Sequence, residues 1–149
     1  MTVDLLAITG DARGEVRRFC WLMQDEVPRL DALTRKLHSL NSDITGRIQR
    51  PDLLSTLLLS GLDRAETTAQ TLVVYRRLGV RYVYYVKLVD AARVKRLALS
   101  HWPSSAQRPT LGYVHGALIR LALQAAETDE GWRRKLALRL RPAPELELT

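Results

Sequence analysis

Apolar residues recur every three or four positions through the first third of the chain, which is the spacing of a helix with one buried stripe. The stripe comprises Val16, Phe19, Met23, Val27, Leu30, Leu33, Leu37, Leu40 and Ile44. Pro28 interrupts it, and we expect a kink there because proline removes a helix hydrogen bond. The pattern predicts a long, kinked N-terminal helical arm over 11–45, in two pieces at 11–26 and 28–45.

The sequence leaves two uses of this arm open. In one, the arm packs as a helical hairpin on its own domain. In the other, its heptad-like spacing makes it a dimerisation surface for a second copy or for a partner protein. The residues of that surface would be Leu30, Leu33, Leu37, Leu40 and Ile44.

A buried helix and a strand are predicted next. Residues 52–59 are apolar nearly all round, which indicates a core helix, and Ser60-Gly61 is expected to end it. From Val80 to Val89, β-branched and aromatic residues alternate with period two, which predicts a β-strand.

The segment before this strand has two interpretations. Residues 70–76 contain strand formers, and folding back at Gly79 would make them the first half of a central β-hairpin. We favour this hairpin. Alternatively, 64–78 forms a helix that, with the helix at 52–59, makes a helix-turn-helix whose wing is the strand at 80–89.

Three further helices are predicted in the C-terminal half. Capping and helix-breaking residues place them at 91–101, at 110–126 and after Thr128. Gly112 and Gly116 lie four positions apart, so another helix can approach them closely.

These elements predict an α+β, mainly α fold in a single domain over 1–149. We expect a helical arm (11–45), a basic body of helices and hairpin (46–141) and an acidic tail (142–149). The alternative is a winged helix-turn-helix.

The charge distribution adds a functional indication to this outline. The chain carries a net charge of +7, and residues 67–126 contain nine Lys and Arg but one acidic residue. The remainder is close to neutral, so the surplus lies in the block that contains the predicted hairpin. Concentrated positive charge with interleaved aromatic rings is typical of a nucleic-acid surface.

We therefore expect DNA to be the favoured partner, bound through the hairpin and the helix after it. The expected contact residues are Arg76, Arg77, Arg81, Tyr85, Lys87, Arg93, Lys95 and Arg96. A two-stranded ribbon fits the major groove of B-DNA, and an exposed tyrosine can instead stack on an unpaired base. The alternative function is a structural or adaptor subunit whose basic block meets an acidic protein.

No motif of the sequence indicates catalysis, so we expect a non-enzymatic protein with no cofactor and no metal site. The histidines His38, His101 and His115 have no metal-ligand spacing, and the single cysteine, Cys20, is expected to be a buried, inert thiol. The N-terminus lacks the features of a secretory signal and no apolar run could span a membrane, so we expect a cytoplasmic location.

The order strand, glycine turn, strand and helix over 71–101 resembles the plan of small ββα DNA-binding modules in recombinases of mobile elements. This resemblance implies DNA binding. The absence of a recognisable active site favours an accessory or regulatory factor over a recombinase.

Overall fold

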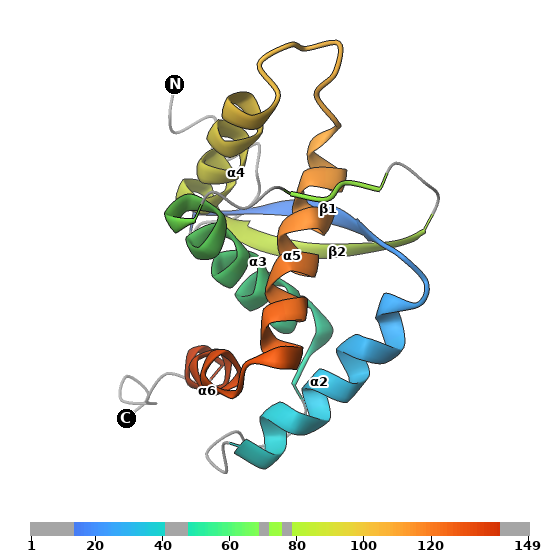
Figure 1. The fold of residues 1–149 in the computed structure, drawn as a ribbon, viewed down its shortest axis with the longest axis vertical. Coiled ribbons are helices and arrows are strands. Elements are labelled where there is room, and N and C mark those ends of the chain that lie inside the picture. Colours follow the sequence, from blue (N-terminus) through green and yellow to red (C-terminus); the bar gives the residue numbers. More distant parts are fainter. Residues whose placement is uncertain (1–13, 41–47, 69–71, 76–78, 141–149) are drawn as a thin grey trace.

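The computed structural model describes residues 14–40, 48–68, 72–75 and 79–140. Within them the protein is mainly helical, with a two-stranded antiparallel sheet near the centre (Figure 1). The elements in chain order are β1 (Glu15–Leu22), α2 (Glu26–Leu40), α3 (Arg50–Thr67), β2 (Val80–Lys87), α4 (Leu88–His101), α5 (Leu111–Thr128) and α6 (Glu130–Arg139). An α+β, mainly α fold is thus confirmed.

The prediction of a helix in the first half of the arm is wrong, because residues 15–22 form strand β1. Val16, Cys20 and Leu22 alternate with more exposed residues and are buried, which is the period-two pattern of a strand with one buried face. Val16 on this face and Phe19 on the other face, three positions apart, gave the appearance of a helical stripe.

The predicted strand at 80–89 is confirmed over 80–87, but its partner is β1. Residues 72–75, part of the expected first hairpin strand, have no regular secondary structure, whereas 70–71 and 76 lie outside the described residues. The backbone amide of Leu88 donates to the carbonyl of Gly14 over 2.8 Å and continues the ladder past the end of the strands. The sheet therefore joins two distant parts of the chain.

The core helix at 52–59 is confirmed, but it continues through Ser60-Gly61 to Thr67. The winged helix-turn-helix is consequently wrong, because no turn separates two helices there. Gly61 has a packing role: a Cβ atom at this position would overlap the backbone carbonyl of Leu118 on α5. The missing side chain lets α3 and α5 pack in direct backbone contact.

Helix α2 corresponds to the second half of the predicted arm and packs on its own domain. Leu30, Leu33 and Leu37 are buried in the central hydrophobic cluster, and Leu40 packs against it. Their side chains therefore pack within the protein and are not exposed to a second copy. Ile44 lies outside the described residues. Pro28 falls in the first turn of α2, where proline is tolerated, so it causes no kink.

The three C-terminal helices are confirmed with small changes of boundary. The cap of α6 is Asp129, whose carboxylate accepts hydrogen bonds from the amides of Gly131 and Trp132. Gly116 on α5 faces strand β1 and not another helix, since a Cβ atom there would overlap the carbonyl oxygen of Trp21. Helix α5 thus lies directly against the backbone of β1, and it crosses the sheet in Figure 1.

Candidate nucleic-acid interface

The two strands carry a solvent-facing surface that we call the outer sheet face. In the β1–β2 register, Arg17 lies opposite Tyr85, and Phe19 lies opposite Val83. The same face continues with Trp21 opposite Arg81 and with Glu15 opposite Lys87. The outer sheet face therefore comprises Glu15, Arg17, Phe19, Trp21, Arg81, Val83, Tyr85 and Lys87.

Aromatic rings on this face are unusually accessible. Phe19 is 44% exposed and Tyr85 is 50% exposed, although both rings would be stabilised by burial. The guanidinium of Arg81 lies 5.4 Å from the centre of the Phe19 ring, in the position of a cation–π contact. The face thus combines flat apolar surface with planar cationic surface.

Helix α5 supports these rings from one side. Trp21 stacks on Tyr113 with ring centres 6.0 Å apart, and both are only partly exposed. A Cβ atom at Gly112 would come within 2.9 Å of the Phe19 ring, so the glycine allows close contact there. The packing holds Phe19 and Trp21 in place while part of the Phe19 ring stays in solvent.

Cations outnumber carboxylates on the outer sheet face. Arg17, Arg81 and Lys87 are all exposed, and Glu15 is the only acidic residue among the eight. Three of the predicted contact residues, Arg81, Tyr85 and Lys87, therefore lie together as expected. The face can attract an anion and offer aromatic surface at the same place.

Arg17 and Phe19 belong to this surface but were not among the predicted contact residues. The sequence pattern assigned both to a helix, in which they would not align with Arg81 and Tyr85. The signal that identifies them is the alternation of Val16, Cys20 and Leu22, which places the odd-numbered residues of the strand on the opposite face.

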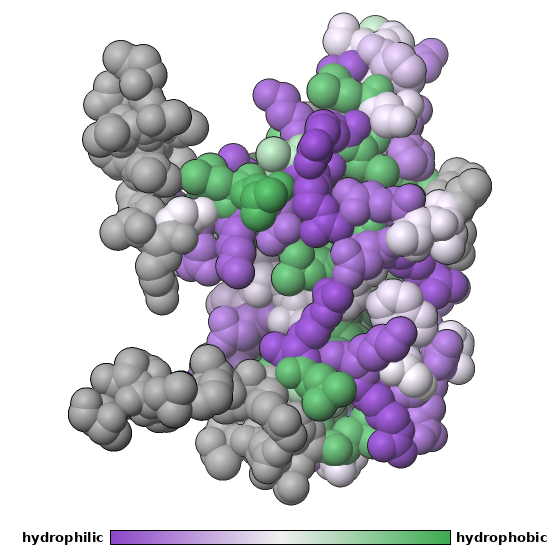
Figure 2. Space-filling model, turned by 90° about the vertical axis from the view of Figure 1, so that its left-hand side faces the viewer, coloured by the Kyte–Doolittle hydropathy of each residue, from purple (hydrophilic) through white to green (hydrophobic). Residues whose placement is uncertain are grey.

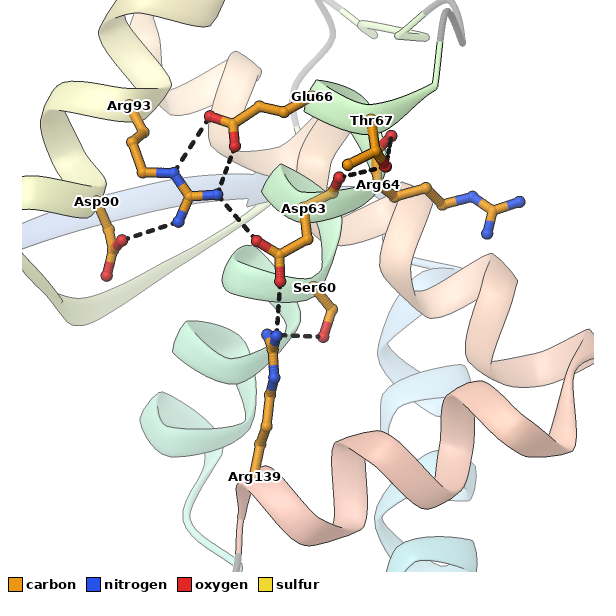
Figure 3. A network of polar contacts seen from close by, with 8 residues as sticks. All are labelled: Ser60, Asp63, Arg64, Glu66, Thr67, Asp90, Arg93 and Arg139. Carbon is orange, nitrogen blue, oxygen red and sulfur yellow. Dashed lines mark hydrogen bonds and ion pairs between the residues drawn. The ribbon is translucent and has the colours of Figure 1, made fainter.

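Arg93, another predicted contact residue, is instead committed to contacts within the protein (Figure 3). Its guanidinium on α4 donates to Glu66 at 2.6 Å and to Asp63 at 2.9 Å, both on α3, and to Asp90 at 3.1 Å. The hydrogen bonds that Arg93 donates to the carboxylates, above all to Glu66, raise the pKa of Arg93 above its usual value. Arg93 therefore joins two helices and has little capacity left for a phosphate.

Arg139 extends the same network from α6 to α3. It donates to Asp63 over 2.6 Å and to the Ser60 hydroxyl over 3.4 Å, as Figure 3 shows. Burial raises the pKa of Asp63, but hydrogen bonds from Arg139 and Arg93 outweigh it, and the net pKa is lowered. The Asp63 carboxylate is thus held ionised between two arginines.

The remaining predicted contact residues divide into two groups. Lys95 and Arg96 are exposed on α4 and pair with no carboxylate in the part of the chain that the structure describes. Arg76 and Arg77 lie outside the described residues, so their place relative to the outer sheet face stays a prediction.

The inner side of the sheet holds titratable groups that are closed to solvent. Burial raises the pKa of Cys20 to about 12, so its thiol stays protonated at neutral pH. His115 on α5 is 1% exposed, and its Nδ1 shares a hydrogen bond with the Tyr84 hydroxyl. Burial, with a smaller contribution from the charge of Arg18, lowers the pKa of His115 to about 4. Tyr84 and His115 therefore bind each other in the core, and Cys20 is buried as well.

Figure 2 shows a face that is mostly hydrophilic, with hydrophobic side chains in separate patches. Among the described residues, no three His, Cys, Asp or Glu side chains gather as metal ligands would, and no helix has the length and apolarity to cross a membrane. No protein-family model, curated protein or solved structure matches the chain.

Proposed function

We propose that the protein is a non-enzymatic, DNA-binding accessory or regulatory protein, and that the outer sheet face is its DNA contact. The observation that carries this proposal is the interleaving of exposed cations with exposed aromatic rings on one face. The residues we assign to the contact are Arg17, Phe19, Arg81, Tyr85 and Lys87.

Each kind of residue has a separate physical task in this proposal. Arg17, Arg81 and Lys87 neutralise phosphates and release their counterions, which supplies most of the non-specific affinity. We add Lys95 and Arg96 to the contact as further exposed cations on α4, the helix that follows β2 without a loop. Arg93 is left out because its guanidinium already binds three carboxylates.

The proposal is tested with a pair of variants that remove equal charge from different places. Arg17→Gln/Lys87→Gln changes the outer sheet face, whereas Arg35→Gln/Lys36→Gln changes exposed residues of α2. Helix α2 runs away from the sheet toward the bottom of Figure 1. Both variants lower the net charge by two, so a general charge effect would act on them equally.

Fluorescence anisotropy with labelled DNA, at salt concentrations from about 50 to 200 mM, gives the affinity and its salt dependence. We expect the outer-face variant to bind more weakly and to lose roughly 1.5 from the slope of log affinity against log salt, since it lacks two phosphate contacts. The α2 variant should bind like the wild type. Equal loss in both variants, or no binding by the wild type at low salt, would overturn the proposal and favour an acidic protein partner.

A further inference from the structure

We infer that the preferred ligand of the outer sheet face is single-stranded DNA, whose unpaired bases stack on Phe19 and Tyr85. This inference rests on the proposed function and narrows it. It concerns whether the face prefers single-stranded or duplex DNA, because positive charge alone attracts both forms.

The two rings have the relative placement that neighbouring bases need. Phe19 is paired with Val83, and Tyr85 lies two residues further along the same strand, so the rings occupy diagonal positions on one face. Side chains in this relation have Cα atoms about 7–8 Å apart, within reach of aromatic rings and separated enough for a base on each. Arg17, opposite Tyr85, and Arg81, over Phe19, place a cation beside each ring.

The composition of the face favours stacking over reading of base edges. In duplex DNA the faces of the bases are covered by their neighbours, and proteins read base edges mainly with polar side chains. Of the polar side chains that read base edges, the outer sheet face has Arg and Lys, which also bind phosphates, but no Asn, Gln, Ser or Thr among its eight residues. Exposed rings form the most favourable stacking contacts with bases whose faces are uncovered, and these are the bases of a single strand.

The rings are also prepared for stacking before a ligand arrives. The Phe19 ring lies close to Gly112, where an added Cβ atom would come within 2.9 Å of it, and the guanidinium of Arg81 lies 5.4 Å from its centre. An Arg guanidinium is itself a plane on which a base can stack. Little side-chain freedom remains to be lost on binding at this ring, which favours affinity.

The test compares an oligo-dT strand of roughly 12 nucleotides, within the usual range of site sizes, with a duplex of the same length. Anisotropy titrations use the full chain and the variants Phe19→Leu and Tyr85→Leu, which remove a ring but no charge. Tyr85→Phe is the matched control, because it keeps the ring and loses the hydroxyl group. Thermal unfolding shows whether each variant is folded.

We expect wild type to bind the single strand more tightly than the duplex. Each Leu variant should lose about fivefold or more in affinity for the single strand, since stacking contributes roughly 1–3 kcal/mol per base. Tyr85→Phe should retain wild-type affinity. If Phe19→Leu fails to fold, Tyr85→Leu still decides the question, because half of the Tyr85 side chain is exposed.

The outcomes separate the inference from the function on which it rests. Equal or tighter binding of the duplex, with Leu variants that bind the single strand like wild type, would overturn the inference and leave DNA binding intact. Failure to bind either form of DNA at low salt would overturn both.

Discussion

The outer sheet face and the contact between helices α3, α4 and α6 are both rich in arginine, but their arginines have opposite surroundings. Arg17 and Arg81 lie in solvent beside exposed rings. Arg93 and Arg139 are bound to carboxylates of α3, which ties three helices together. The first pair is available to a polyanion, and the second pair stabilises the fold.

This difference shows why a count of charges along the chain overstates the basic surface. The carboxylates that neutralise Arg93 include Asp63 and Glu66, just before the basic block, and Arg120 in that block pairs with Glu26. Apart from Asp90, which also pairs with Arg93, these acidic partners come from outside the block and reach it only through folding. A cation contributes to a binding surface when folding leaves it without such a partner.

The largest effect is expected when a paired arginine in the interior is removed. The Arg120 and Glu26 side chains are 12% and 3% exposed, and Arg120 donates to both carboxylate oxygens. Arg120→Met should therefore cost about 3 kcal/mol of unfolding free energy in a urea titration. The cost arises because buried Glu26 would keep as partners, among the described residues, only the amide of Met23 and the guanidinium of Arg29, 4.0 Å away. The double variant Glu26→Gln/Arg120→Met should recover part of this loss. A loss within the range of a surface pair, below about 1 kcal/mol, would place Arg120 with the solvent-exposed arginines.

Lowering the pH should reduce the unfolding free energy by a similar amount at most, because it protonates His115 on the inner side of the sheet. His115 has a folded pKa of about 4 against an ordinary value near 6.5, so the unfolded chain binds the proton more readily. The stability that depends on neutral His115 is complete above about pH 6.5 and is lost as the pH falls toward 4, by about 3 kcal/mol in total. Urea unfolding across this window measures the loss, and His115→Gln should remove this contribution. Wild-type stability that does not change between about pH 7 and 4.5 would contradict the burial of a neutral histidine.

Removing the Arg93 side chain should lower the unfolding free energy but leave the affinity for DNA unchanged. Arg93→Ala leaves Asp63, Glu66 and Asp90 close together without their shared cation and should cost about 1–3 kcal/mol of unfolding free energy. Its affinity for DNA, measured on folded protein, should stay close to wild type. Lys95→Ala is the matched control on the same helix and should change stability little. Weaker DNA binding by folded Arg93→Ala would show that the paired arginine also contacts the ligand.

The smallest effect on stability is expected on the outer sheet face itself. Arg17→Gln/Lys87→Gln should change the unfolding free energy by no more than about 0.5 kcal/mol, because both side chains are exposed. The same variant is expected to weaken DNA binding, so the two measurements should move independently. A loss of unfolding free energy above about 1 kcal/mol would show that these cations stabilise the fold, as Arg93 does.

Much of the fold could be predicted from the sequence because its signals are local. The apolar segment at 52–59, the alternation after Val80 and the capping residues before α6 each specify an element within a few turns of chain. Arg81, Tyr85 and Lys87 were placed together for the same reason, since the period of a strand puts them on one face. The errors arose where two patterns overlapped, as at β1, where the spacing of Val16 and Phe19 continued the stripe of α2.

By itself the sequence determined the helical segments, one strand and the positive charge of the block around it. The tertiary structure alone decided that β1 completes the sheet, that Arg17 and Phe19 join Arg81 and Tyr85, and that Arg93 is neutralised. The physical reason is the distance along the sequence over which each interaction acts. Periodicity and capping act between near neighbours, whereas a strand pair or an ion pair can form between any two segments that the hydrophobic core brings together.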